Sequence, residues 1–176
     1  MARIAVIGIG NVLEGDDAVG PTVVGLFQAT YQVPEDVELI DGGTPGLDMT
    51  AYMAGLEALV VVDAVTAKGQ PGDVVVLDKP RILNRGPIIA LSPHDPGLRE
   101  SILHAEFQGV APRVISLVGV VPASIEFGCK LSAEARAALP VAVAAVRSAL
   151  EAVGVTVVRR DPPLVPDLWW ERPQHT

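Results

Sequence analysis

The chain opens with an apolar strand followed at once by a glycine-rich turn that carries acidic side chains. Residues 3–9 are almost continuously apolar and β-branched, as in a strand covered on both faces. The turn that follows, residues 8–20, contains Asp16 and Asp17, and Pro21 stands where a helix can begin. Such an opening is typical of an α/β fold. It places acids at the carboxyl end of a strand, where ligands collect in open α/β sheets.

The same alternation of apolar strands and helical spacing continues along the chain. The predicted helices are residues 20–31, 47–55, about 96–106 and 132–153. The predicted strands after the first are residues 36–41, 59–63, 74–77 and 113–121, and residues 113–121 are expected to be the last strand of the chain. Only residues 66–72 separate the strands at 59–63 and 74–77, so we expect these two to form an antiparallel hairpin. Residues 79–93 have the pattern of a long irregular connection, and Pro140 is expected to kink or divide the closing helix. The pattern predicts a three-layer αβα fold with a mixed, mostly parallel, twisted sheet of about five strands.

Composition limits the possible classes of protein. Residues 1–160 are expected to form a single domain, and residues 161–176 a proline-containing tail around Trp169 and Trp170. No apolar run reaches the ~18 residues needed to span a bilayer, and the net charge of −8 with scattered basic residues opposes nucleic-acid binding. The single cysteine, Cys129, excludes an internal disulfide, and no secretory pattern opens the sequence. We therefore expect a cytoplasmic protein with no nucleic-acid or membrane partner.

Polar side chains follow three of the expected strands. Asp17 comes after the first strand, Asp41 after the second and Asp63 at the end of the third, and the long connection leads to His94. Carboxylates and an imidazole that converge suit a borderline divalent cation such as nickel, zinc, iron or manganese. Each residue also has a plainer interpretation. Asp16 or Asp17 fits an acidic helix start, Asp63 a cap, and His94 a packing histidine.

A nucleotide site is not expected at the opening turn. Gly8, Gly10 and Asp41 are placed as in a dinucleotide fingerprint, but the third glycine of that motif is replaced by Leu13, and the acids of the turn would repel a pyrophosphate. The sequence also has no GK[ST] phosphate loop and no GxSxG nucleophile elbow. Cys129 lacks the local pattern of a nucleophile and is interpreted as a structural thiol.

Several ordered motifs within about residues 3–153 also match a known family. They are Gly8-Ile9-Gly10-Asn11-Val12-Leu13 with Asp16-Asp17, Asp41-Gly42-Gly43-Thr44-Pro45-Gly46, Val62-Asp63-Ala64, Ser92-Pro93-His94 and Leu117-Val118-Gly119-Val120-Val121-Pro122. In these motifs the chain resembles the hydrogenase maturation endopeptidases, which trim the large subunit of nickel-iron hydrogenases. The resemblance implies a monomer that removes a C-terminal extension from the large-subunit precursor once nickel is installed. It also implies that Asp17, Asp63 and His94 contact that nickel.

Nickel is then carried by the substrate, and added zinc or cadmium would fit the same ligands. Two routes of hydrolysis stay open. Either a metal-bound water attacks the peptide, or a supporting carboxylate, Asp16 or Asp41, activates an unbound water. The alternative function is a non-catalytic accessory protein of the same fold that binds metal or precursor.

Overall fold

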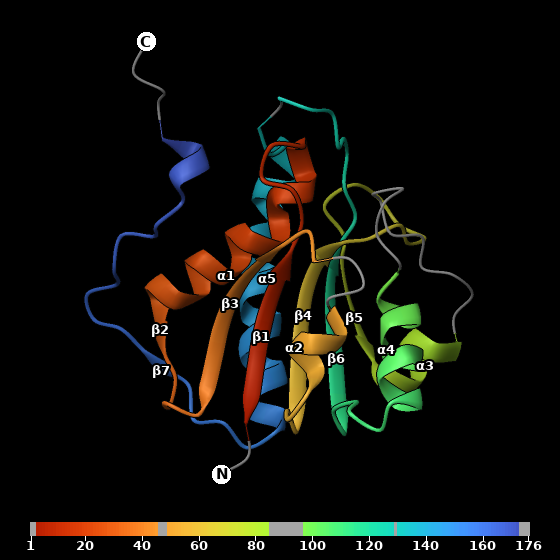
Figure 1. Ribbon diagram of the computed structural model, residues 1–176. Helices are drawn as coiled ribbons and strands as arrows, with labels where there is room; N and C mark the ends of the chain where they lie inside the picture. Colours follow the sequence, from red (N-terminus) through yellow and green to blue (C-terminus); the bar gives the residue numbers. More distant parts are fainter. Residues whose placement is uncertain (1–2, 46–48, 85–96, 129, 173–176) are drawn as a thin grey trace.

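A five-stranded sheet forms the centre of the computed structural model, which describes residues 3–45, 49–84, 97–128 and 130–172 (Figure 1). The strands lie in the spatial order β3 (Val37–Gly43), β1 (Ile4–Ile9), β4 (Ala58–Ala64), β6 (Val114–Val120) and β5 (Val74–Asp78). β5 is antiparallel to its neighbour, and the other four strands are parallel to one another. The predicted mixed, mostly parallel sheet is confirmed.

Helices cover both faces of the sheet and make the fold three-layered (Figure 1). One face packs against α1 (Val19–Thr30) and α5 (Ala133–Ala152), and the other against α2 (Met49–Met53), α3 (Lys79–Asn84) and α4 (Leu98–Phe107). Successive strand residues point to opposite faces, so Val6 joins the core under α1 and α5 while Ile7 joins the core under the other helices. Since both faces are covered, all six residues of β1 are buried, which explains the continuous apolar run.

The expected hairpin between residues 59–63 and 74–77 is wrong in its pairing, although the antiparallel direction of β5 is right. β6 lies between β4 and β5 and pairs with both. The connection from β4 to β5 passes over the end of β6, where the Val65 amide donates to the Val120 carbonyl and the Gly72 amide to the Val121 carbonyl. The burial of each strand gives the physical reason. The mostly apolar and largely buried β6 takes the interior position, and the more exposed β5 takes the edge.

Two further expectations about helices are corrected. Residues 79–93 are not wholly irregular, because α3 begins at Lys79, and its start is capped by Asp78, whose Oδ1 accepts from the Arg81 amide at 3.0 Å. Pro140 does not divide the closing helix, since α5 runs unbroken from Ala133 to Ala152. The Pro140 ring is exposed, so water can satisfy the carbonyl that loses its amide partner, while the apolar face of α5 stays buried.

Residues 158–172 lie along the outer side of α1 (Figure 1). A short antiparallel pair joins β2 (Tyr31–Gln32) to β7 (Val158–Arg159), so residues 113–121 are not the last strand. Further on, the Leu164 amide donates to the Ala29 carbonyl, and a helical turn, η3 (Trp169–Glu171), ends the described part of this segment. None of the helices in the described ranges is both long and apolar enough to cross a membrane.

Candidate functional site

The carboxyl ends of β1, β3 and β4 meet at one edge of the sheet, and the predicted acids lie there. Gly8 of β1 is level with Asp41 of β3 on one side and with Val62 of β4 on the other. Asp41 and Asp63 therefore stand two strand spacings apart, about 10 Å between backbones. Alternation along the strands places Asp63 on the face covered by α2 and α4, and Asp41 on the face covered by α1. The Asp41 side chain is exposed and that of Asp63 is half-buried.

Glycines bring the opening turn back against the strand ends. Gly10 has φ +140°, and a Cβ built there would lie 1.8 Å from the Asp17 carbonyl oxygen. A Cβ on Gly20 would lie 2.1 Å from the carbonyl oxygen of Ile9 and 2.6 Å from that of Val62. Real side chains do not fit at such distances, so only glycine lets the backbone pass this closely. The close approach fixes the acidic turn over the ends of β1 and β4.

Asp17 lies in the helical turn η1 (Gly15–Ala18) that leads into α1, and it is only 6% exposed. Its Oδ2 accepts a short hydrogen bond, 2.6 Å, from the backbone amide of Asn11. A backbone donor of this kind favours the charged carboxylate and fixes its orientation. The chain thus holds a buried carboxylate, with a defined direction, at the edge that also carries Asp63.

The neighbouring carboxylate of Asp16 is 1% exposed and accepts hydrogen bonds from four donors. Its Oδ2 accepts from the amides of Ala123 and Ser124, at 2.7 and 3.3 Å, and from the Ser132 hydroxyl at 2.8 Å. Its Oδ1 accepts from the Ser132 amide at 2.6 Å. Ser132 is the N-cap of α5 and accepts in turn from the Ala135 amide. Asp16 therefore ties the opening turn to the start of α5 and to the loop before it.

Part of the predicted metal site cannot be compared with the structure. His94 and Cys129 lie outside the described residues. Within residues 3–45, 49–84, 97–128 and 130–172, no three His, Cys, Asp or Glu side chains are grouped so as to hold a metal ion. The oxygen donors Asp17 and Asp63 suit a divalent cation, and an imidazole would complete a mixed set. The assignment of Asp17, Asp63 and His94 as metal ligands stays a prediction.

The residues that support the two aspartates are not predictable from the sequence. The Asn11 amide, which orients Asp17, is part of the glycine-rich opening motif, but a backbone donor leaves no signal in residue type. The amides of Ala123 and Ser124 lie more than 100 positions from Asp16 along the chain, so no local pattern links them. Ser132 is recognisable only as a helix cap.

The fold and this edge together define a class: an α/β protein with a mixed sheet that gathers acidic side chains at the carboxyl ends of its parallel strands. A family model described as hydrogenase maturation protease matches residues 21–149, well over half of the chain. The hydrogenase 2 maturation protease of Escherichia coli K12 is 33% identical over 163 residues, 90% of this chain and 97% of the relative. The hydrogenase expression/formation protein HupD of Rhizobium leguminosarum bv. viciae is 32% identical over 177 residues, 97% of this chain and 88% of the relative.

Solved structures agree with these relatives. The hydrogenase maturating endopeptidase HybD from E. coli superimposes with a TM-score of 0.79 at 33% identity, covering 91% of this chain and 99% of that one. The chain belongs to the hydrogenase maturation protease family. It is accordingly a hydrolase that acts on peptide bonds.

Proposed function

We propose that the protein removes the C-terminal extension from the nickel-loaded large-subunit precursor of a nickel-iron hydrogenase. In this proposal Asp17, Asp63 and His94 bind the nickel carried by the precursor and so position the scissile peptide. The observation that carries it is the buried Asp17 carboxylate, held by the Asn11 amide on a rigid turn at the edge that carries Asp63. A fixed carboxylate of this kind suits recognition of a cation that arrives with the substrate.

Nickel acts here as a recognition signal. The three ligands from the enzyme leave the remaining positions of the ion to groups of the precursor, so the complete site forms only when both proteins meet. Tight binding of free nickel by the enzyme would remove the difference between loaded and unloaded precursor. We therefore expect the isolated chain to bind free nickel weakly.

Two routes of hydrolysis are candidates, and the hydrogen bonds of Asp16 argue against its use in the second route. A metal-bound water is acidified by the cation and attacks the peptide. Alternatively, a carboxylate removes a proton from an unbound water. Asp16 is poorly suited to that second role, because its oxygens already accept from four donors and its side chain is 1% exposed. Asp41 is exposed, so it is the better supporting carboxylate for a water-activating step.

A cleavage assay tests the proposal. The full chain is mixed with purified precursor, either nickel-loaded or nickel-free, and the precursor mass is followed by mass spectrometry. We expect shortening of the loaded precursor only. Cleavage of both forms would refute the requirement for nickel in the precursor, and cleavage of neither form would favour the non-catalytic accessory role.

Three variants then test the site residues in the same assay. Asp17→Asn, Asp63→Asn and His94→Ala should each abolish processing of the loaded precursor. Asp36→Asn is the matched control, because it removes the same charge at the amino end of β3, at the opposite end of the strands from the candidate site. Normal processing by one of the three would remove that residue from the site.

The proposal includes a monomer acting in the cytoplasm. The single cysteine is compatible with a reducing compartment. Sedimentation of the purified chain at micromolar concentration would check the monomer, and fractionation of the source cells would check the compartment.

A further inference from the structure

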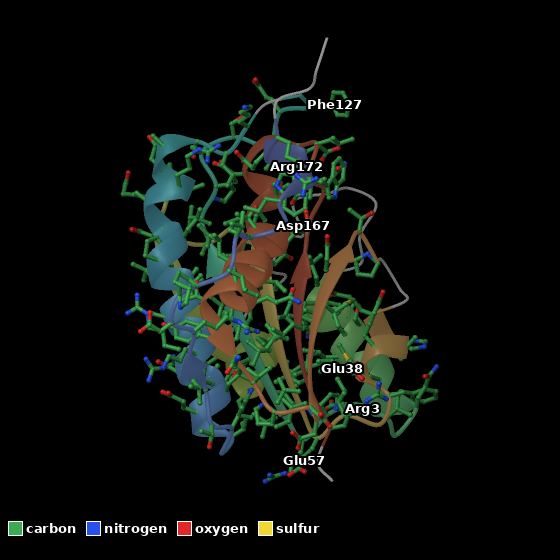
Figure 2. All side chains as sticks on the ribbon, turned by 90° about the vertical axis from the view of Figure 1, so that its left-hand side faces the viewer. Arg3, Glu38, Glu57, Phe127, Asp167 and Arg172 are labelled. Carbon is green, nitrogen blue, oxygen red and sulfur yellow. The ribbon has the colours of Figure 1, made fainter. Side chains whose placement is uncertain are left out.

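A short two-segment ribbon stands beside the acidic turn at the carboxyl edge of the sheet. We call it the rim ribbon and define it as residues 11–14 and 123–128. Glu14 and Phe127 form an antiparallel bridge, and the Gly128 amide donates to the Leu13 carbonyl at 2.8 Å. Figure 2 shows Phe127 at the end of the molecule opposite to Arg3, Glu38 and Glu57, which lie near the amino ends of the strands. The rim ribbon is thus at the same edge as Asp17.

The rim ribbon exposes a large apolar side chain on a fixed backbone. Phe127 is 76% exposed, whereas Phe27, another of the three phenylalanines, is fully buried in the core. The bridge to Glu14 holds the Phe127 backbone, and the amides of Ala123 and Ser124 donate to Asp16. An exposed aromatic ring on a preorganised backbone is the kind of group that anchors protein interfaces, because little order is lost on binding.

Asp16 also fixes the distance between this ring and the candidate site. Besides its side-chain contacts, the Asp16 amide donates to the Ser124 carbonyl at 2.9 Å. Asp16 immediately precedes Asp17 in the chain, and the Asn11 amide that orients Asp17 belongs to the rim ribbon. A polypeptide that touches Phe127 is therefore held in a defined position relative to the Asp17 carboxylate.

The charge beside the ring indicates the chemistry of the partner. Residues opposite each other in an antiparallel bridge point to the same side, so the Glu14 side chain lies on the same side of the ribbon as Phe127. An apolar ring next to a carboxylate fits a polypeptide segment in which an apolar side chain neighbours a basic one.

We propose that the rim ribbon is the docking surface for the precursor polypeptide, with Phe127 as its apolar anchor and Glu14 as its charge partner. The inference rests on the proposed function for the identity of the partner. Exposure of an aromatic ring is not sufficient to identify a docking surface, because Phe107 at the end of α4 is 92% exposed but lies toward the amino ends of the strands, away from the candidate site. Phe107 therefore provides a matched control.

The experiment measures precursor binding and precursor cleavage separately. The immobilised full chain is titrated with nickel-loaded precursor by biolayer interferometry, and the same proteins are assayed for kcat and KM by mass spectrometry. Phe127→Ala should raise Kd and KM about tenfold with little change in kcat, and Phe127→Trp should retain affinity. Phe107→Ala should stay within twofold of the unmodified chain. Glu14→Gln should slow association, most clearly at low salt.

The outcomes distinguish this inference from the proposed function. Equal affinities of Phe127→Ala and Phe107→Ala, with normal cleavage by the unmodified chain, would overturn the docking surface and leave the function standing. Binding that Phe127→Ala weakens, without cleavage by the unmodified chain, would overturn the function and support the docking surface. Failure of the unmodified chain to bind the precursor would overturn the inference. Thermal unfolding of Phe127→Ala should be unchanged, since the ring is exposed.

Discussion

Replacement of Asp16 by Asn is the sharpest test of how the site is supported. The substitution keeps the size of the side chain but removes its charge and turns one acceptor oxygen into a donor nitrogen. All four partners of Asp16 are donors: the amides of Ala123, Ser124 and Ser132, and the hydroxyl of Ser132. Neither orientation of the amide can therefore satisfy all of them.

The structure gives the size of the effect. In the less costly orientation the nitrogen replaces Oδ1, so the Ser132 amide loses its partner and faces another donor, while the Oδ2 contacts persist with a weaker, neutral acceptor. A lost charge-assisted bond together with a buried, unsatisfied amide costs about 3 kcal/mol. For a chain of this length about 3 °C of Tm corresponds to each kcal/mol, so we expect Tm to fall by about 9 °C.

Urea denaturation followed by circular dichroism is the assay, with Asp36→Asn as the control for lost charge. Ser132→Ala removes one donor to Asp16 and also the α5 cap, so it should cost about 1 to 2 kcal/mol. The double variant Asp16→Asn/Ser132→Ala should be less destabilised than the two single effects added together, because the neutral acceptor in Asp16→Asn has already weakened the contact with the Ser132 hydroxyl that Ser132→Ala removes. A free energy of unfolding for Asp16→Asn within about 0.5 kcal/mol of the unmodified chain would refute the reasoning, since such a value is expected of an unconstrained surface carboxylate.

Three further changes test the local structure. Gly20→Ala should destabilise the fold by about 3 kcal/mol or more in urea titration, because its Cβ would lie 2.1 Å from a backbone oxygen. Gly25→Ala should stay within about 1 kcal/mol of the unmodified chain, because its Cβ meets only the flexible end of Leu168. Equal effects of the two would contradict the packing of the opening turn. Asp78→Ala should cost about 1 kcal/mol by loss of the α3 cap, again in urea titration, and no change would mean that the cap is not formed. Leu168→Ala should speed amide hydrogen exchange in residues 164–172 without slowing cleavage, and unchanged exchange would show that this contact does not hold the segment.

The layers of the fold are predictable because their signals are local. The continuous apolar runs of β1 and β4 indicate strands buried on both faces, and the intervening helical spacing requires parallel crossovers. The neighbour of β5 is not predictable in this way, because it depends on the insertion of β6, some 40 residues further along the chain. The start of α3 did carry a local signal, Asp78 followed by Lys79 and Pro80, but the length of the segment favoured a loop.

In the candidate site, too, the features that depend on local sequence are predictable, and those that depend on distant contacts are not. Parallel strands bring Asp41 and Asp63 to one edge, so their shared position follows from the strand pattern alone. The different surroundings of Asp16 and Asp17 do not follow from it, because the partners of Asp16 lie 107 to 116 positions away.

An acidic pair at a helix start has one simple interpretation, favourable interaction with the helix dipole, and that interpretation treats both residues alike. The contacts separate them. The charge of Asp16 is met by four donors from residues 123–132, which leaves it little capacity to bind a cation or to accept a proton from water. Those contacts also fix the turn on which the Asn11 amide orients Asp17. A substitution at Asp16 should therefore reduce stability and processing together, whereas the proposed role of Asp17 in nickel binding requires loss of processing even where the chain stays folded.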